Sequence, residues 1–189
     1  MASWVCQEFF TLPHVTPSSR YDCSHVMSAL SQLSPGLVAM IARGVSVNVA
    51  SRDERLRPSA MRAMGSSVDV AGGTVTVYLA RRQAAQLLQD IETTGRIAAI
   101  ISEPATHVTV QLKASSATLR AATEDDRPAM ERYLRSMEHE IRRVGHPESI
   151  TRAMLAWRLD DLVAVTFAPE QAFEQTPGSR AGQLVARAS

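Results

Sequence analysis

Alternating hydrophobic and polar positions predict β-strands along much of the chain. In "VSVNVAS" (45–51) every second residue up to Val49 is valine, which indicates a strand with one buried face. The segments "PSAMRAMGSSV" (58–68) and "HVTVQLKASSATL" (107–119) each predict one strand. "RIAAIIS" (96–102) predicts a short buried strand, and "DLVAVTFAPE" (161–170) predicts the last one.

Three other segments have the spacing of helices. Ser34 and Pro35 supply an N-cap and a first-turn proline for "GLVAMIAR", and Gly44 ends that helix. The segment "RRQAAQLLQDIETTG" (81–95) places its apolar residues on one face and stops at its final glycine. "DDRPAMERYLRSMEHEIRRVG" (125–145) begins acidic and ends basic, which suits the helix dipole.

Short turns join most of the predicted strands. Gly72-Gly73 lies between two β-branched runs and predicts a two-residue hairpin loop. Turns of this length require antiparallel neighbours, and a sheet of about six strands can remove its edges by closing into a small barrel. We therefore predict a mainly β protein with flanking helices. Residues 32–189 form its single domain, and residues 1–31 precede it as an extension of uncertain order.

Composition narrows the class of protein. The hydrophobic content of 45% is ordinary for a globular domain, and a net charge of +1 argues against nucleic acid or an anionic membrane as the main partner. Cys6 and Cys23 are too few for a disulfide framework, which favours the reducing cytoplasm. Neither a signal peptide nor a membrane-spanning run is evident.

Lys113 is the only lysine in a chain with 19 arginines, and it lies on the predicted strand 107–119. Alternation places His107, Thr109, Gln111 and Lys113 on the face opposite Val110 and its apolar neighbours. This polar row is either a solvated outer face or a surface that meets the polar edge of a cofactor or a partner subunit.

Two groups of arginines are candidate phosphate ligands. Arg57 and Ser59 share one face of the strand 58–68 and its entry, with Arg62 on the opposite face, and a guanidinium beside a hydroxyl suits a phosphate. Arg81 and Arg82 fall where a strand enters a helix, and a helix N-terminus favours an anion. Surface arginines without a ligand are the alternative in both cases.

Other kinds of site have little support in the sequence. There is no HExxH, no GxSxG, no metal-spaced cysteine pair and no GxGxxG after a strand, so we predict no metal. His139 belongs to "EHE", which is the solvated face of a helix. No side chain is an evident general acid or base, and the catalytic residues are unknown.

The order of these pieces resembles the pyridoxamine 5'-phosphate oxidase-like family of FMN-binding split-barrel proteins, specifically its uncharacterised bacterial branch. The likeness runs from about Leu33 to Gly182. It is carried by "GVSVNVASRDERLRPSAMRAMG", "VTVYLARRQAAQLL", "GRIAAIISEPATHVTVQLKA" and "LVAVTFAPEQAFEQTPGSRAG". The resemblance implies a homodimer of antiparallel split barrels with FMN at the subunit interface. It implies an FMN-dependent oxidoreductase whose small-molecule substrate is unknown.

The resemblance also assigns phosphate contacts. Arg57, Ser59 and Arg62 match the strand that borders the flavin and its phosphate. Arg81 and Arg82 match the basic pair at the start of the inserted helix. The chain departs from the oxidases proper at its tail "QTPGSRAGQLVARAS", which lacks their basic substrate-binding segment.

Contacts to the flavin ring follow from the same resemblance. Gln111 matches a glutamine that faces the flavin, and Lys113 follows it on the same face. Two alternatives stay open. The protein could be a non-catalytic split-barrel carrier or sensor of a flavin, a deazaflavin or haem, or a dimeric scaffold that has lost its cofactor.

Overall fold

The computed structural model of the protein describes residues 28–188. Four α-helices and ten β-strands make up most of this part of the chain. The helices are α1 (Pro35–Arg43), α2 (Ala85–Thr94), α3 (Arg127–Arg143) and α4 (Glu148–Met154). The strands are β1 (Ser46–Arg52), β2 (Pro58–Arg62), β3 (Gly65–Asp69), β4 (Thr74–Ala80), β5 (Ile97–Ser102), β6 (Thr109–Ala114), β7 (Thr118–Ala121), β8 (Leu162–Phe167), β9 (Gln171–Glu174) and β10 (Leu184–Arg187). Short 3-10 helices cover Ala29–Gln32, Glu124–Asp126 and Leu159–Asp161.

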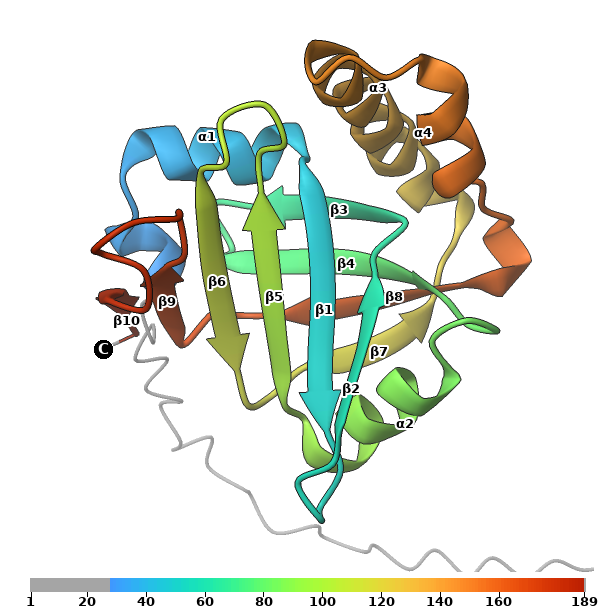
Figure 1. The fold of residues 1–189 in the computed structure, drawn as a ribbon. Helices are drawn as coiled ribbons and strands as arrows, with labels where there is room; N and C mark the ends of the chain where they lie inside the picture. The colour runs from blue at the N-terminus through green and yellow to red at the C-terminus, as the bar shows by residue number, and fades with distance from the viewer. Residues whose placement is uncertain (1–27, 189) are drawn as a thin grey trace, which may run out of the picture.

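The strands form two antiparallel sheets that pack across a shared core. The larger sheet has the order β10-β9-β6-β5-β1-β2, and the smaller has the order β3-β4-β8-β7. In Figure 1 the larger sheet lies in front of the smaller one, with their strands crossing steeply. This confirms the mainly β prediction with flanking helices. The ten strands exceed the predicted six, and the described strands do not pair into one closed barrel.

The predicted strand 58–68 is in fact two strands, in different sheets. Ala63 N–H still bonds to Val47 of β1, whereas the next residue, Met64, bonds to Tyr78 of β4. The first residue of β3 is Gly65, and a Cβ there would lie 2.4 Å from the sulfur of Met130, so the missing side chain leaves room for α3 at this corner. The alternation breaks at the corner, where Ala63 and Met64 are adjacent apolar residues and both are buried. No proline or polar turn separates the two strands, which is why the segment was predicted as one.

The predicted strand 107–119 also divides between the sheets, into β6 and β7. His107 lies in the turn before β6 with a φ of 62°, so it does not belong to the polar strand face. The segment after the last predicted strand, 161–170, contains β9 and β10, which extend the larger sheet beyond β6. Four-residue strands carry too short an alternation to be recognised, which explains the low strand count.

The helix predictions agree with the structure except at one end. Ser34 caps α1 as expected, since its side chain accepts from the backbone N–H of Leu37, and Gly44 ends that helix. The hairpin between β3 and β4 is present, but its loop has four residues, 70–73, because Asp69 accepts from Gly72 N–H. The helix α2 starts at Ala85 rather than directly at the two arginines.

The core lies between the two sheets and is closed at its ends by helices. Tyr133 of α3 is fully buried, and its hydroxyl accepts from the backbone N–H of Val47 at 3.3 Å. Ala29 and Leu30 are also buried, and Ala29 N–H donates to the carbonyl of Pro169. The rest of the predicted extension lies outside the described residues. Within residues 28–188 no helix is both long and apolar enough to cross a membrane.

Candidate functional site

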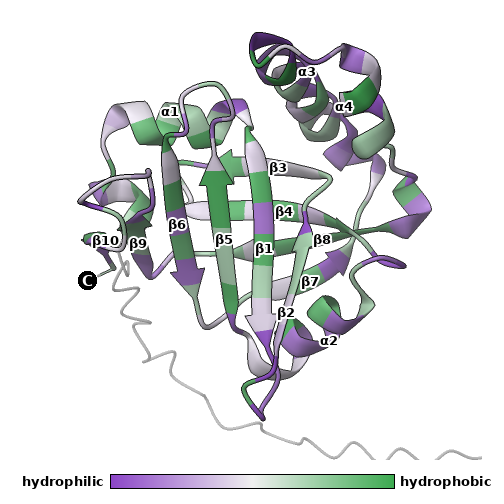
Figure 2. Ribbon diagram, viewed as in Figure 1, coloured by the Kyte–Doolittle hydropathy of each residue, from purple (hydrophilic) through white to green (hydrophobic). Residues whose placement is uncertain are grey.

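The larger sheet turns one face away from the core, and no described helix covers the middle of it (Figure 1). Its central strands alternate between buried and exposed positions. In β6, Val110, Leu112 and Ala114 are buried, whereas Gln111 and Lys113 are half-buried on the outer side. This confirms the prediction that both side chains lie on the face of the strand opposite Val110. Figure 2 shows hydrophilic stretches between hydrophobic ones along β6 and β1, as this alternation requires.

A row of alanines crosses the outer face beside Lys113. Strand register pairs Lys113 with Ala98 of β5, Ala98 with Ala50 of β1, and Ala50 with Ala60 of β2. Three neighbouring strands therefore present only methyl groups at this level, over a width of about 10 Å at roughly 4.8 Å per strand. Longer side chains on both sides leave a hollow over Ala98 and Ala50, which we call the alanine floor, whereas Ala60 on the edge strand does not line it.

The neighbouring row on the same face is bulkier. Gln111 pairs with Ile100, Ile100 with Asn48, and Asn48 with Arg62. The contrast between this row and the alanine floor explains why a groove forms on one side only. Ile100 remains 36% exposed, so this part of the sheet offers an uncovered apolar side chain next to polar ones.

The groove over the alanine floor has a volume of about 620 Å³. This lies within the range of small-molecule sites. Arg52, Leu56, Arg96 and Lys113 are among the side chains that line it, with Ala50 and Ala98. Leu56 is 67% exposed and has a φ of 64° in the turn between β1 and β2. A left-handed backbone carries strain for leucine, and such strain is concentrated at functional sites.

Two side-chain contacts lie on the Lys113 side of the groove, one made by Lys113 itself and one by the neighbouring Gln111. The Lys113 ammonium lies 4.5 Å from the centroid of the Phe173 ring, the distance of a cation–π contact. Phe173 pairs with Gln111 across β6 and β9, and the Gln111 side chain accepts from Gln175 at 3.5 Å. Within residues 28–188 Lys113 makes no ion pair with a carboxylate.

Arg57 and Ser59 lie on a different surface, where acidic groups already engage them. Arg57 precedes β2 and donates to the carboxylate of Asp53 at 2.7 Å. The Ser59 hydroxyl makes a short hydrogen bond to Asp90 of α2, a carboxylate that is 3% exposed. A phosphate here would meet two carboxylates, Asp53 and Asp90, which does not favour an anion.

Arg62 lies on the opposite side of β2 from Ser59, as alternation predicted. Its guanidinium donates to the hydroxyl of Ser46 at 3.0 Å on the outer face. In the register of the sheet, β5 and β1 separate it from Gln111, a distance of about 14 Å. It therefore belongs to the same face as Gln111 and Lys113, but to its far edge.

Arg81 and Arg82 lie in a turn before α2, beside an aspartate. Arg81 N–H donates to the carbonyl of Asp161, and Arg82 N–H donates to the carboxylate of the same residue at 3.3 Å. The Arg82 side chain also lies 3.7 Å from that carboxylate. Within the described chain, no hydrogen bond or ion pair connects this pair to the other five predicted residues.

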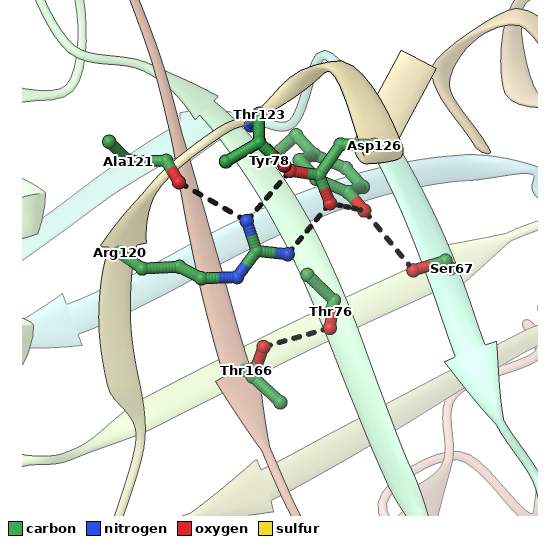
Figure 3. Close-up of polar contacts among 8 residues, drawn as sticks. All are labelled: Ser67, Thr76, Tyr78, Arg120, Ala121, Thr123, Asp126 and Thr166. Carbon is green, nitrogen blue, oxygen red and sulfur yellow. Dashed lines mark hydrogen bonds and ion pairs between the residues drawn. The ribbon is translucent and has the colours of Figure 1, made fainter. Parts of the chain in front are cut away.

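A separate polar cluster lies on the outer face of the smaller sheet (Figure 3). Both Asp126 carboxylate oxygens accept from the Arg120 guanidinium at 2.7 Å, and the Tyr78 hydroxyl donates to one of them at 2.9 Å. The hydrogen bonds from Arg120 lower the pKa of Asp126 most, and those from Thr123 N–H and Tyr78 lower it further. The pKa of Asp126 therefore lies far below its usual value. Burial raises the pKa of Tyr78. The cluster fastens β7 and the start of α3 to β4.

Metal chemistry has no support in the described residues. No group of three histidine, cysteine or carboxylate side chains there could hold a metal ion. Neither His107, His139 nor His146 is among the residues that line the groove.

Sequence reasoning missed Arg52 and Arg96, which lie at the end of β1 and just before β5. Ala50 and Ala98 also escaped notice. Their small size at alternate positions of two strands is visible in the sequence, but a floor arises only once the register between the strands is known.

The fold has counterparts among solved structures. No protein-family model and no curated protein matches the chain. An F420 reductase matches with a TM-score of 0.51 and 10% identity, covering 74% of this chain and 98% of its own. HupZ from Group A Streptococcus matches with a TM-score of 0.48 and 13% identity, covering 79% and 99%.

A third solved structure carries the name that the sequence resemblance suggested. A pyridoxamine 5'-phosphate oxidase-related, FMN-binding protein from Nostoc punctiforme PCC 73102 matches with a TM-score of 0.46 and 14% identity, covering 78% of this chain and 88% of its own. Identities this low speak to the fold alone. The predicted resemblance is confirmed as a likeness of fold, and the F420 reductase, with a TM-score above 0.5, carries it.

Proposed function

We propose that the protein binds a flavin-type cofactor on the alanine floor and acts as an oxidoreductase. One arrangement carries this proposal: Ala98 and Ala50 lie side by side on neighbouring strands, and Lys113 lies next to Ala98 at one side of the floor. A flat heterocycle can approach a sheet closely only where the side chains beneath it are small. The groove volume of about 620 Å³ accommodates such a molecule.

The residues around the floor fit a flavin electrostatically as well. When bound, a flavin or deazaflavin supplies the hydride chemistry, and the protein supplies position and charge. Lys113, which has no acidic partner in the described part of the chain, places a positive charge at one side of the floor, and such a charge stabilises negative charge on a reduced ring. Gln111 adds an amide that can exchange hydrogen bonds with the ring's polar edge.

Both FMN and the deazaflavin F420 suit this chemistry. The F420 reductase with the same fold takes its name from the second of these, and FMN is the cofactor that the sequence resemblance implies. Haem is disfavoured, because no described histidine lines the groove to serve as an axial ligand. The substrate and the electron donor follow from neither the groove nor the fold.

We further propose that a second copy of the chain covers this face in a homodimer of split barrels. The exposed Ile100 and the uncovered sheet face around it support that arrangement. A dimer would exclude water from a cofactor that is otherwise open on one side, which strengthens the electrostatic effect of Lys113. Light scattering should give twice the mass of the chain, and a monomer would contradict this part of the proposal.

The absorption spectrum of the purified protein tests the cofactor. We expect the visible bands of an oxidised flavin or deazaflavin, either as purified or after addition of FMN or F420, and bleaching by a reduced nicotinamide. A protein that takes up neither cofactor would contradict the proposal. A Soret band would instead favour the haem carrier.

A further inference from the structure

Three cationic residues line the groove, whereas its described lining residues include one carboxylate. Arg52, Arg96 and Lys113 all line it, and none forms an ion pair within residues 28–188. This sets them apart from the many arginines that do, such as Arg57 with Asp53. Because this chain pairs so many of its guanidinium groups with acids, three unpaired cations around one hollow need an explanation.

The one carboxylate at the groove does not supply the missing counter-charge. Glu170 accepts from Ser115 through both its backbone N–H, at 2.9 Å, and its hydroxyl, at 2.6 Å. One oxygen of Glu170 is thus occupied by hydrogen bonds to Ser115, the residue that follows β6. The side chains of the groove together carry three positive charges and one negative charge, so the groove attracts anions.

Contacts place the three cationic residues around the floor, through the side chains of Arg52 and Lys113 and the backbone of Arg96. Arg52 is the last residue of β1, and its guanidinium donates to the carbonyl of Asp53 at 3.2 Å. Arg96 precedes β5, and its carbonyl accepts from the Ser51 hydroxyl at 2.7 Å, which ties the two ends together. Lys113 is held over Phe173. All three therefore surround the alanine floor from its rim.

We propose that Arg52, Arg96 and Lys113 form a binding site for the phosphate group of a small organic molecule whose flat body rests on the alanine floor. Guanidinium groups bind phosphate oxygens bidentately, and an ammonium adds a point charge. The phosphate belongs either to the flavin cofactor or to a separate substrate. The first case rests on the proposed function, whereas the second does not require a flavin at all.

The single lysine provides a direct test. Pyridoxal 5'-phosphate and pyridoxal both form imines with lysine, with loss of water, and borohydride fixes the adduct by delivering hydride to the imine carbon. Peptide mass spectrometry then measures modification of Lys113, with the chain's α-amino group as internal reference. Pyridoxal closes to a cyclic hemiacetal and reacts more slowly with every amine, so each Lys113 rate is divided by the rate at the α-amino group. On that relative scale we expect the phosphorylated aldehyde to modify Lys113 at least about tenfold faster than pyridoxal, the factor expected of a charge-assisted contact.

Variants separate the proposed site from general electrostatic attraction. R52Q and R96Q should each reduce the advantage of the phosphorylated aldehyde, and R62Q, on the same face but outside the groove, should retain it. Inorganic phosphate should protect Lys113 in the unaltered protein. Equal modification by the two aldehydes, or an advantage unchanged in R52Q and R96Q, would overturn the site.

Flavins as competitors then identify the source of the phosphate. Protection of Lys113 by FMN that exceeds protection by riboflavin assigns the site to the cofactor's phosphate. If inorganic phosphate protects Lys113 but neither flavin does, the site holds a separate phosphorylated molecule. The phosphate site then stands, and the proposed flavin function is contradicted. If flavin binding is lost in R81Q and R82Q but not in R52Q and R96Q, the cofactor's phosphate lies at the predicted pair before α2.

Discussion

The ammonium group of Lys113 lies 4.5 Å from the centre of the Phe173 ring, across the pair of strands β6 and β9. The ring attracts the cation and restricts its position. Unlike a carboxylate partner, the ring does not neutralise the positive charge. The only lysine of the chain is thus held in place with its charge available at the edge of the alanine floor.

Removing that charge should lower the reduction potential of a bound flavin. In K113M the negative charge of the reduced ring loses its nearest cation, and we expect a fall of about 30 mV or more, equivalent to ~1.4 kcal/mol for two electrons. A dye-coupled titration of the reconstituted protein measures it. R62K, which keeps a cation at the far edge of the same face, serves as the control and should leave the potential unchanged.

Replacing the aromatic ring should loosen Lys113 without touching its charge. We expect F173L to weaken flavin binding about twofold to fivefold, the equivalent of a cation–π contact of about 0.5–1 kcal/mol. F173Y keeps the ring and should bind as the unaltered protein does. Isothermal titration calorimetry compares the three proteins, and equal affinities for F173L and F173Y would show that the contact has no role.

Two glycines at the ends of α1 should respond to alanine in opposite ways. Gly44 has a φ of 84°, and a Cβ there would lie 2.9 Å from the Tyr133 ring, so G44A should destabilise the fold by about 1–3 kcal/mol. Gly36 has nothing within 4 Å, and G36A should be neutral or stabilising by up to about 1 kcal/mol. Urea unfolding measures both, and a similar loss in the two variants would contradict the packing of α3 on Gly44.

Acid should weaken the Asp126 cluster in a defined pH range. The folded-state pKa of Asp126 is depressed below its ordinary value of 3.8, so its contribution to stability is complete above about pH 4 to 5 and is lost as the pH falls further. D126N should therefore lose about 2 kcal/mol at pH 7, the scale of hydrogen bonds to a charged group. The gap between D126N and the unaltered protein should narrow as the pH drops.

The exposed neighbour Asp125 provides the matched control for that experiment. D125N should retain the stability of the unaltered protein at pH 7 and the same acid dependence. Urea unfolding at several pH values distinguishes the variants. A constant gap between D126N and the unaltered protein down to pH 2 would show that Asp126 is not ionised by its partners in the fold.

Much of the secondary structure could be predicted from local pattern, but the division into two sheets could not. The alternation in 58–68 breaks at Ala63-Met64 and that in 107–119 breaks at Ser115-Ser116, but neither break tells which sheet the following residues join. The signal at the first corner is Gly65, whose meaning depends on Met130, a residue far away in the sequence. Such a contact is a property of the assembled fold.

The candidate site was predictable in part for the same reason. The facing of Gln111 and Lys113 follows from the period of a strand, and the structure bears it out. The groove depends on register between β6, β5 and β1, and on Arg52 and Arg96 at the ends of two strands. Arg81 and Arg82 resembled a phosphate pair, but their partner Asp161 comes from a distant segment.

The affinity of flavin for the protein with an altered floor tests the central claim most directly. Fluorescence titration of FMN and of F420 should give saturable binding of at least one of them to the unaltered protein. A98L, which fills the floor beside Lys113, should weaken that binding at least about tenfold. A60L makes the same change in the same row, outside the groove, and should retain it. Equal affinity in A98L and A60L, or no binding to the unaltered protein, would contradict a cofactor on the alanine floor.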